Sequence, residues 1–598
     1  MTAYIIGIDL GTTNCTLAYT PVGSTEISLF SIPQFTAPGV LGEQFSLPSF
    51  TYFPLQEELE AKIADKSYCV GAFARNRGAE LPNRLIASAK SWLCHGGIDR
   101  REKLLPIGAE EGEEKMSPLE ANAALLRHLK EAWDLKMVDA PFKNQQILIT
   151  VPASFDPSAR QLVLEAAEAA DYPEVILLEE PQAAFYGWIH AHADEWRKQL
   201  KVEDTILVVD IGGGTTDFSL ISVTDEAGNM GLKRRAVGSH LLLGGDNFDL
   251  ALAYLAKGKL EDQGHAIDDW QLQSLVHVCR TAKEQLLGEA SPTSYDITIH
   301  GRGSRLIGGT LTTAISQEEA LNLLVDGFLP LVTPQDRSII ERRSGIQQIG
   351  LPYAQDARIS AQLAKFLSMT GEVDSTSMDN FVVPTALLFN GGTLKASALR
   401  TRLIEQLNQW AKECKAPAVI ELPGSDYDFA VSRGAVSYGL ARNGQGVRIK
   451  GGTSRSYWIG VEEAVPAVPG LPMPLKAVCI VPFGMEEGTE QELSHQEFAL
   501  VLGEQATFRF FSHSTPTLSS GQEAVTGMIV KNWKQELSEL HPIETVLPKT
   551  ETDGKTVRVK IKSRVTELGT LEVWCEAHDE RKWKLEFDIR AQDEAAAK

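Results

Sequence analysis

The sequence ILVVDIGGGTTDFSL at residues 206–220 constrains the fold of this chain more than any other stretch. Its first four residues form the continuous apolar run typical of a strand buried on both faces. Asp210, three glycines and two threonines end that run, and an extended apolar pattern resumes at Phe218. Glycine lets the backbone turn tightly and approach a ligand without a Cβ in the way. The stretch therefore predicts a hairpin whose amides can cradle a phosphate, with a solvated glycine-rich hairpin as the alternative.

A second copy of this pattern begins the chain. Residues 4–14, YIIGIDLGTTN, again contain an apolar strand, an acid at Asp9, a glycine and a pair of threonines. Two copies about 200 residues apart are too distant for a solenoid repeat and fit two related lobes. Two such hairpins facing each other across a cleft could grip a polyphosphate from both sides. Asp9 and Asp210, at the two strand ends, could then hold a hydrated Mg²⁺, which prefers a few carboxylates and several waters.

Composition excludes several classes of function. The chain has 598 residues, enough for several domains, and 57 Lys and Arg against 79 Asp and Glu give a net charge of −22. Nucleic acid is therefore not expected as the main partner, because phosphate neutralisation needs a basic face. Seven scattered cysteines without a CxxC pair indicate neither a zinc ribbon nor a disulfide framework. No leader and no membrane-spanning run are visible, so we expect a cytoplasmic protein that binds no membrane.

Apolar periodicity and breakers predict the elements between the two motifs. Helical spacing is present at 85–93, and Ser117 with Glu120 predicts the N-terminal cap of a helix over 117–138. Helices are also predicted over 157–170, 182–192, 270–287, 318–331, 393–410 and 429–440, the last with small residues suited to close packing. Strands are predicted over 146–151, 175–178 and 384–389, with short ones within 291–314. Residues 334–380 yield no prediction.

The pattern changes near residue 443. Residues 443–456, NGQGVRIKGGTSRS, are rich in glycine and basic residues and predict a linker. Beyond them apolar and charged residues alternate, as in 557–562 and 583–589. Alternation of this kind is typical of half-buried antiparallel strands. The C-terminal part is therefore predicted to be a separate β-rich domain of about 140 residues.

Several motifs in order resemble the seventy-kilodalton heat-shock (DnaK-like) chaperone family, within the actin and sugar-kinase fold group. Besides the two phosphate motifs they are ITVPASFDPSARQ (149–161), LLEEPQAAFYG (177–187), LGGDNFD (243–249), LFNGGTLK (388–395) and DFAVSRGAVSYG (428–439). The resemblance covers about three quarters of the chain. It implies an α/β fold, with a two-lobed actin-like ATPase domain at 1–443, a linker at 444–456 and a β-sandwich-like domain at 457–598.

The resemblance also implies roles for individual residues. Asp9 and Asp210 would hold Mg²⁺ through water, with K⁺ as a further candidate ion. The implied catalytic group is Lys90, Glu180, Asp210 and Thr215. The implied contacts to ATP or ADP are Gly11, Thr12, Thr13, Asn14, Gly212, Gly213, Gly214, Thr215, Gly244, Gly245, Lys283, Gly391, Gly392, Thr393, Lys395 and Asp428. Pro152 and Arg160 match an interdomain relay. Phosphoryl transfer to water needs positioning and charge neutralisation more than covalent chemistry.

Departures from the family pattern modify these expectations. Arg280 and Glu284 stand where the family has an acid and an adenine-stacking arginine, and Lys395 replaces a second stacking arginine. A flat guanidinium stacks on a base better than an ammonium does, so we expect weak adenine binding. The linker offers only Val447 and Ile449 as apolar residues. No helical lid follows the last predicted strand, so weak trapping of client peptides is expected.

The leading hypothesis is an ATP-dependent, chaperone-like protein. ATP binding and slow hydrolysis would control a C-terminal domain that binds an extended polypeptide or a dedicated protein partner, with a co-chaperone or exchange factor as a further partner. An actin-like scaffold whose assembly depends on nucleotide is the first alternative. A small-molecule kinase of the same fold is the second, although no motif for a phosphoryl acceptor is visible.

Overall fold

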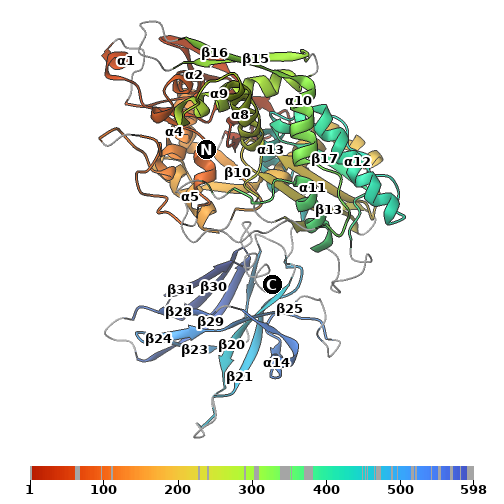
Figure 1. Ribbon diagram of the computed structural model, residues 1–598. Coiled ribbons are helices and arrows are strands. Elements are labelled where there is room, and N and C mark those ends of the chain that lie inside the picture. The colour runs from red at the N-terminus through yellow and green to blue at the C-terminus, as the bar shows by residue number, and fades with distance from the viewer. Residues whose placement is uncertain are drawn as a thin grey trace. The chain divides into compact units, whose positions relative to one another are not determined.

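A computed structural model gives the structure of the chain (Figure 1). It describes residues 3–60, 67–95, 97–109, 112–155, 157–226, 229–238, 241–288, 291–301, 309–336, 351, 353–369, 381–446, 449–450, 453, 455–463, 465–466, 473–485, 489–493, 496–513, 518, 522–540, 542–549, 554–565, 570–579 and 581–588. The chain divides into two compact units: Met1–Gly231 with Ala236–Arg448, and Leu232–Arg235 with Ile449–Lys598. All seven cysteines are free thiols.

The first unit contains two sheets built on the same plan. The first has the order β11-β10-β1-β2-β3, with bounds Val175–Glu179, Gln146–Val151, Tyr4–Leu10, Asn14–Pro21 and Ser28–Leu29. The second has the order β18-β17-β12-β13-β14, with bounds Ile420–Glu421, Ala386–Asn390, Thr205–Ile211, Thr216–Glu226 and Asn229–Val237. In each, an antiparallel hairpin (β1–β2 or β12–β13) has two parallel strands beside it. The repeated motif therefore corresponds to a repeated sheet.

Both central strands are buried because their side chains are apolar on both faces. Four of the seven residues of β1 and five of the seven residues of β12 are buried aliphatic residues, and Val209 on β12 packs in one large core with Leu275 and Phe389. A strand buried in this way needs cover on each side, which α/β folds supply with helices. Thus the apolar runs at both motifs place the two hairpins at the centres of their sheets.

Helices and short strands complete the first unit. The α-helices are α1 (Gln56–Glu60), α2 (Ala72–Glu80), α3 (Ala89–Trp92), α4 (Pro118–Lys136), α5 (Pro157–Ala169), α6 (Glu180–His192), α7 (Trp196–Gln199), α8 (Gly245–Asp262), α9 (Asp269–Leu286), α10 (Gln317–Leu321), α11 (Ile359–Met369), α12 (Ser397–Glu413) and α13 (Ala430–Arg442). The remaining strands are β4 (Ile32–Ala37), β5 (Val40–Gln44), β6 (Ser46–Pro48), β7 (Thr51–Tyr52), β8 (Cys69–Val70), β9 (Leu85–Ile86), β15 (Ser294–His300) and β16 (Thr310–Ser316). In Figure 1 the β15–β16 hairpin extends along one end of this unit beside α9 and α10.

Most elements lie where the sequence predicts them. The predicted cap of α4 is confirmed, because the Ser117 hydroxyl accepts the Glu120 amide at 3.0 Å and the Glu120 carboxylate accepts the Ser117 amide at 2.8 Å. The helix predicted over 318–331 is present from Gln317 but contains a π-helical turn over Asn322–Asp326, after which helical residues continue only to Phe328. Within 334–380, α11 occupies Ile359–Met369. Residues 337–350, 352 and 370–380 lie outside the described residues.

The helical spacing at 85–93 is misleading. Leu85 and Ile86 form strand β9, paired with β7, and only the four residues of α3 are helical. Ser88 separates them with φ 53, in the left-handed region. Such a conformation is uncommon for a residue with a Cβ and interrupts any right-handed helix. The apolar spacing reflects burial of this segment rather than a continuous helix.

The second unit consists mainly of strands. One sheet has the order β26-β21-β20-β25-β27, with bounds Ile529–Val530, Leu475–Val481, Ser456–Glu462, Phe510–His513 and Ser538–Glu539. A second contains β22 (Glu490–Glu492) and β23 (Phe498–Val501), which both pair with β29 (Thr556–Val565), followed by β30 (Thr570–Ala577) and β31 (Lys582–Asp588). The remaining elements are β24 (Gln505–Phe508) with β28 (Ile543–Val546), α14 (Trp533–Glu536), and β19 (Ile449–Lys450), whose Ile449 is the parallel partner of Leu232.

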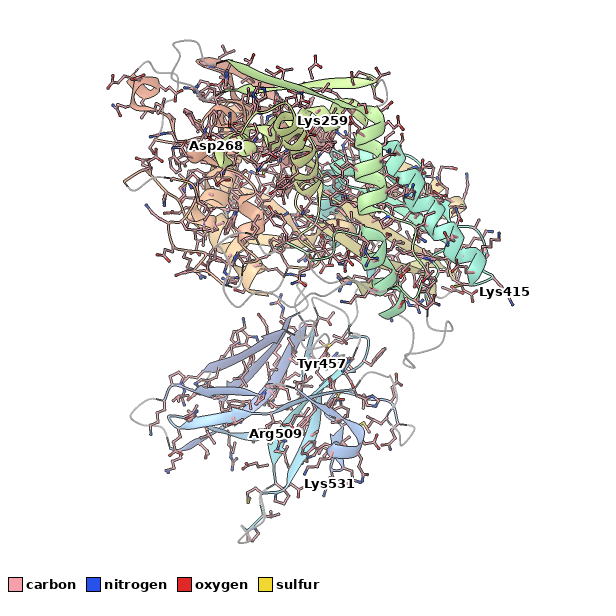
Figure 2. The ribbon with its side chains drawn as sticks, viewed as in Figure 1. Lys259, Asp268, Lys415, Tyr457, Arg509 and Lys531 are labelled. Carbon is pink, nitrogen blue, oxygen red and sulfur yellow. The ribbon has the colours of Figure 1, made fainter. Side chains whose placement is uncertain are left out.

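Alternating residues of the two sheets share one core in this unit. Tyr457 and Phe510 come from the first sheet, and Val559 and Leu585 from the second. At the edge of the first sheet Arg509 (Figure 2) forms an ion pair with Glu539 at 2.6 Å. Within the predicted linker 444–456, residues 447, 448, 451, 452 and 454, Val447 among them, lie outside the described residues, as does Ile589. The alternating pattern therefore predicts the described β-structure correctly.

Helices α6 and α13 approach each other unusually closely. A Cβ placed on Gly434 would lie 1.6 Å from the carbonyl oxygen of Ala183, and one placed on Gly187 would lie 2.5 Å from that of Ala430. The obstacles are backbone atoms, which cannot move aside as a side-chain end can. The small residues predicted over 429–440 therefore do permit close packing.

Gly434→Ala tests this packing. We expect the added methyl to lower the free energy of unfolding by about 1–3 kcal/mol, the usual cost of overpacking. Gly258→Ala on α8 is the matched control, because a Cβ there has no neighbour within 4 Å. That control should leave stability unchanged or raise it by about 0.5–1 kcal/mol, since alanine favours helix. Thermal denaturation by circular dichroism measures both, and equal melting temperatures would contradict the packing argument.

Candidate functional site

The two glycine turns of the first unit touch each other. One turn follows β1 and the other follows β12. A Cβ on Gly213 would lie 1.8 Å from Oγ1 of Thr13, and one on Gly214 would lie 2.8 Å from Cγ2 of Thr12. Cβ contacts below 3.0 Å essentially never occur, so a side chain at either glycine would force the opposing threonine side chain to move. The absence of a Cβ at both glycines therefore lets the two halves of the repeat come this close.

Two further glycine segments pack against the second turn. A Cβ on Gly244, which precedes α8, would lie 2.8 Å from the carbonyl oxygens of Gly212 and Gly213. Gly391, after β17, has φ +89, and a Cβ there would lie 2.6 Å from Oδ1 of Asp210. The hydroxyl of Thr393 donates to the Gly212 carbonyl at 2.9 Å. The structure thus gathers the predicted segments 212–215, 244–245 and 391–393 around one turn.

The first turn is held by residues that were not predicted. The Ser49 hydroxyl donates to the Gly11 carbonyl at 2.6 Å, and the Ser49 amide donates to the Thr13 carbonyl at 2.8 Å. The second strand of the hairpin begins at Asn14, whose carbonyl would lie 2.2 Å from a Cβ on Gly11. The turn is therefore tight in itself and anchored from a neighbouring strand end.

Lys90 is a buried cation beside this contact. It lies on α3, has an exposed fraction of 3%, and forms an ion pair with Glu180, the first residue of α6. Its Nζ lies 5.8 Å from the centre of the Phe155 ring. Burial alone would lower the pKa of Lys90, but the charges of Glu180 and Asp9 outweigh it and the net pKa is raised. Lys90 is therefore protonated at neutral pH.

The acids at the two strand ends share one buried region. Asp9 accepts a hydrogen bond from the Thr150 hydroxyl at 3.2 Å, and Asp210 accepts one from the Asn390 side-chain amide at 2.7 Å. Burial, followed by the charge of Glu180, raises the pKa of Asp9 to about 7 and that of Asp210 well above its ordinary range. Asp9 and Asp210 also repel each other. This region carries more negative charge than Lys90 can neutralise.

Two further acids increase this imbalance. Burial raises the pKa of Glu180, although Lys90 opposes the shift. Asp217, on β13, is also buried, accepts the Ser154 amide at 3.3 Å, and has a raised pKa, chiefly because of burial. No group of three or more His, Cys, Asp or Glu placed to hold a metal ion occurs among the described residues.

A second charged cluster joins α8 and α9. Arg280 forms ion pairs with Asp246 and with Asp249, both at 2.7 Å, and Lys283 contacts Asp249 at 2.6 Å. Lys283 also donates to the Gly245 carbonyl at 3.2 Å, which connects the cluster to the glycine segments. The resemblance points to Lys283 but not to Arg280. The acids of GGDNFD (244–249) are the sequence signal that could have indicated Arg280, because buried carboxylates require a cationic partner.

The same cluster also contacts Ser88 and Phe50, which precede the strands of the second sheet in the sequence. The Ser88 hydroxyl donates to Asp246 at 2.7 Å. The guanidinium of Arg280 lies over the Phe50 ring, 5.5 Å from its centre, within the range of a cation–π contact. These contacts hold α8 and α9 against the surroundings of the first sheet.

Four predicted site residues lie apart from the glycine turns or serve local packing. Lys395 and Asp428 form an ion pair at 2.5 Å, both about half exposed, and within the described residues neither shares a hydrogen bond or ion pair with the turns. Arg160 is almost fully buried and donates to the carbonyls of Ala153 and Phe155 at 2.9 and 2.8 Å. It also pairs with Glu179 at 3.1 Å, next to Glu180. Pro152 follows β10 directly.

Comparison with known proteins identifies the family of the chain. The family model for the Hsp70 protein matches residues 5–324, more than half of the chain, and the chain belongs to the Hsp70 family. Chaperone protein HscA homologs from Pseudomonas aeruginosa (strain LESB58) and Acinetobacter baylyi (strain ATCC 33305 / BD413 / ADP1) are 31% and 28% identical over 304 and 297 residues. Each match covers 48% of this chain and 42% of the relative, so the chain matches less than half of these relatives' length. In the part of the chain that the structure describes, none of the helices is both long and apolar enough to cross a membrane.

His277, on α9 beside Arg280, makes the stability of this region depend on pH. Burial, followed by the charge of Arg280, lowers the pKa of His277 from 6.5 to about 4. The unfolded chain binds this proton below pH 6.5 and the folded chain does not until about pH 4. Stability is therefore lost as the pH falls, by about 2 kcal/mol at pH 5 from this group alone.

His277→Gln removes the titrating group. We expect the variant to lose less stability than the parent between pH 7.5 and pH 5, measured as the drop in melting temperature. His265→Gln, at an exposed position after α8, is the control and should follow the parent. The role of His277 is contradicted if the melting temperatures of the parent and of both variants fall equally between pH 7.5 and pH 5.

Proposed function

We propose that this chain is an ATP-dependent, chaperone-like ATPase in which nucleotide controls a C-terminal partner-binding domain. The observation that carries the proposal is the contact between two glycine turns, each following a strand that presents an acid. Membership in the Hsp70 family supports it, as does the similarity to relatives that are named chaperones. A phosphate needs backbone amides close to it, and turns without Cβ atoms supply them.

In this proposal the phosphates of ATP bind between the two turns. The amides of Gly212, Gly213, Gly214 and Thr215, with the hydroxyls of Thr12 and Thr13, would hold them. Thr13 and Gly213 touch in the structure, so binding would part the two turns slightly. Gly11 and Asn14 would close the first turn, and Gly244, Gly245, Gly391, Gly392, Thr393 and Lys283 would border the nucleoside.

Mg²⁺ fits the same site. Asp9 and Asp210 have raised pKa values because burial and like charges disfavour their ionised forms. A divalent cation between them would relieve this repulsion, and Mg²⁺ held by few carboxylates keeps several water ligands. The cation would supply charge neutralisation for the triphosphate. The donor set is hard oxygen, which suits Mg²⁺ and leaves K⁺ as a further candidate.

Lys90 and Glu180 are the proposed catalytic pair. Lys90 is charged and buried, so its ammonium can neutralise charge that develops on a transferring phosphoryl group. Glu180 contacts Lys90 and lies within electrostatic reach of Asp9 and Asp210. From there it would orient the attacking water, and Thr215 would lie near the terminal phosphate. Hydrolysis would be slow, because no further positioning group for water is assigned.

We assign residues 1–443 to a two-lobed actin-like ATPase domain, 444–456 to a linker and 457–598 to a β-sandwich-like domain that binds an extended polypeptide or a dedicated protein. Pro152 and Arg160 would couple the two, since Arg160 reaches Glu179 beside Glu180. Asp428 and Lys395 pair with each other, and Arg280 is held by two aspartates. These ion pairs support weak adenine binding, because neither Lys395 nor Arg280 is free to stack on a base.

Measuring ATP turnover with and without unfolded polypeptide tests the proposal. We expect slow phosphate release that requires Mg²⁺, stops with EDTA and rises severalfold when an unfolded polypeptide is added. Absence of both ATP binding and turnover would refute it. ATP-dependent sedimentation without stimulation would favour the scaffold alternative, and an ADP burst that needs a sugar would favour the kinase.

Lys90→Ala tests the catalytic assignment. We expect turnover to fall at least about hundredfold while ATP affinity changes little, because the lysine acts mainly on the transition state. Removing one partner of a buried ion pair can destabilise the fold by about 3–5 kcal/mol, so a double variant Lys90→Met with Glu180→Gln serves as a folded reference. Lys257→Ala, at a partly exposed ion pair on α8, is the control. Unchanged turnover in folded Lys90→Ala would exclude Lys90 from catalysis.

A further inference from the structure

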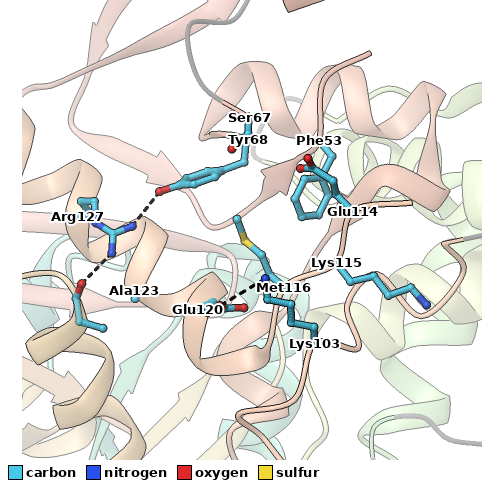
Figure 3. A pocket seen from close by; sticks show the side chains of 11 residues that line it. Phe53, Ser67, Tyr68, Lys103, Glu114, Lys115, Met116, Glu120, Ala123 and Arg127 are labelled. Carbon is cyan, nitrogen blue, oxygen red and sulfur yellow. Dashed lines mark hydrogen bonds and ion pairs between the residues drawn. The ribbon is translucent and has the colours of Figure 1, made fainter. Parts of the chain in front are cut away.

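A cavity lies in the first unit, and none of the residues assigned above lines it. Its volume is about 530 Å³, within the range of about 300–1,000 Å³ that is usual for small-molecule sites. Six separate parts of the chain contribute to its wall: Phe53, Ser67 and Tyr68, Lys103, the segment 114–116, and the helices α4 and α5. Figure 3 shows Arg127 and Tyr68 on one side of it and Lys103 and Lys115 on the other, with Met116 between them.

Arg127, on α4, is fixed in position without an acidic partner. Its Nη1 donates to the Tyr68 hydroxyl at 2.9 Å, and its Nη2 donates to the Ala169 carbonyl at 2.7 Å (Figure 3). Both acceptors are neutral, and no ion pair of Arg127 occurs within the described residues. A guanidinium has five N–H donors, so these two bonds leave three. Arg127 therefore offers a preorganised positive charge whose orientation has already been set.

The wall of the cavity has an excess of positive charge. Lys103, Lys115 and Arg127 face two acids, Glu114 and Glu120, whereas the whole chain carries −22. Glu120 is already engaged, because it accepts the Ser117 amide at 2.8 Å and lies 4.0 Å from Lys103. Lys115 makes no hydrogen bond or ion pair with any described residue. The cavity thus favours an anion in a chain that generally repels anions.

Much of the rest of the wall is apolar. Phe53 belongs to a hydrophobic cluster with Ala89 and Trp92, and the side chains of Tyr68 and Met116 pack on that cluster. A bare inorganic anion would leave this apolar wall in water, whereas a molecule with a flat hydrocarbon body would cover it. The combination of a held guanidinium, a lysine at 115 without an ion pair among the described residues, and an apolar wall describes a site for an organic anion.

We propose that this cavity binds a small organic anion, with its acidic group at Arg127 and its apolar body against Phe53, Tyr68 and Met116. Arg127 binds the acid by charge-assisted hydrogen bonds, which are about twice as strong as neutral ones. Lys103 and Lys115 raise the positive potential at the other side. The proposal is independent of the nucleotide site, because no residue is shared.

Phenyl phosphate is the probe, titrated into the full chain carrying labelled alanine and methionine methyl groups. The methyl signals of Met116 and Ala123 report binding by nuclear magnetic resonance, because both line the cavity. This readout is local, so phosphate that enters the glycine turns does not contribute to it, and saturating ATP and Mg²⁺ should leave it unchanged. We expect saturable shifts of these methyl signals with phenyl phosphate. Inorganic phosphate and phenol should bind with an affinity at least about tenfold lower.

Three variants locate the anion. Arg127→Gln should weaken phenyl phosphate binding at least about tenfold, and Lys115→Gln about fivefold. Arg127 also holds the end of α5, so Lys115→Gln, which removes no contact, is the variant that keeps the test valid if Arg127→Gln unfolds. Arg101→Gln, outside the cavity and paired with Glu165 at 2.7 Å, should change nothing. Equal binding of phenol and phenyl phosphate, equal effects of Lys115→Gln and Arg101→Gln, or no shift at Met116 would overturn the proposal.

Discussion

The close contact between Thr13 and Gly213 is the constraint on which the first unit depends. Each residue lies at the end of the central hairpin of its own sheet, so the contact fixes where one sheet stands relative to the other. The absence of a side chain at residue 213 allows this close contact. Since both hairpins present an acid one strand position before the turn region, the contact also carries Asp9 and Asp210 into one buried place. The repeat in the sequence thus becomes a concentration of like charge.

That concentration is only partly compensated by the protein itself. Thr150 and Asn390 each donate one hydrogen bond, and Lys90 supplies one positive charge. A buried like-charge group favours protonation or a bound cation, because burial removes the water that would otherwise screen it. In a site of this kind the repulsion between like charges destabilises the fold. A cation that binds there removes this repulsion, and the free energy of repulsion that is removed adds to the free energy of cation binding. The arrangement therefore links cation affinity to stability.

The sequence predicts the elements and the two turns because their determinants are local. Apolar runs, glycines and strand-end acids act within about 15 residues. Lys90 was assigned only through resemblance, since a lone lysine on an apolar segment is usually solvated, and its partner is 90 residues away. The left-handed Ser88 and the pairing of Arg280 with Asp246 also depend on tertiary contacts that no short pattern encodes. The cavity beside Arg127 was not predicted for the same reason, because its wall comes from six separate segments.

Arg280 shows how one departure from a family pattern can alter the role of a position. The resemblance places an acid there, but here the acids are Asp246 and Asp249 of α8 and the cation is on α9. A reversal of charge at one position is tolerated when the opposite charge stands within contact distance, and two carboxylates at 2.7 Å provide it. The guanidinium is then occupied on its edges by these carboxylates and on one face by Phe50. We infer that the residue joins α8 and α9 to the Phe50 segment instead of presenting a free surface to a base, so any loss of adenine contact is matched by a gain in the contacts that hold the two sheets together.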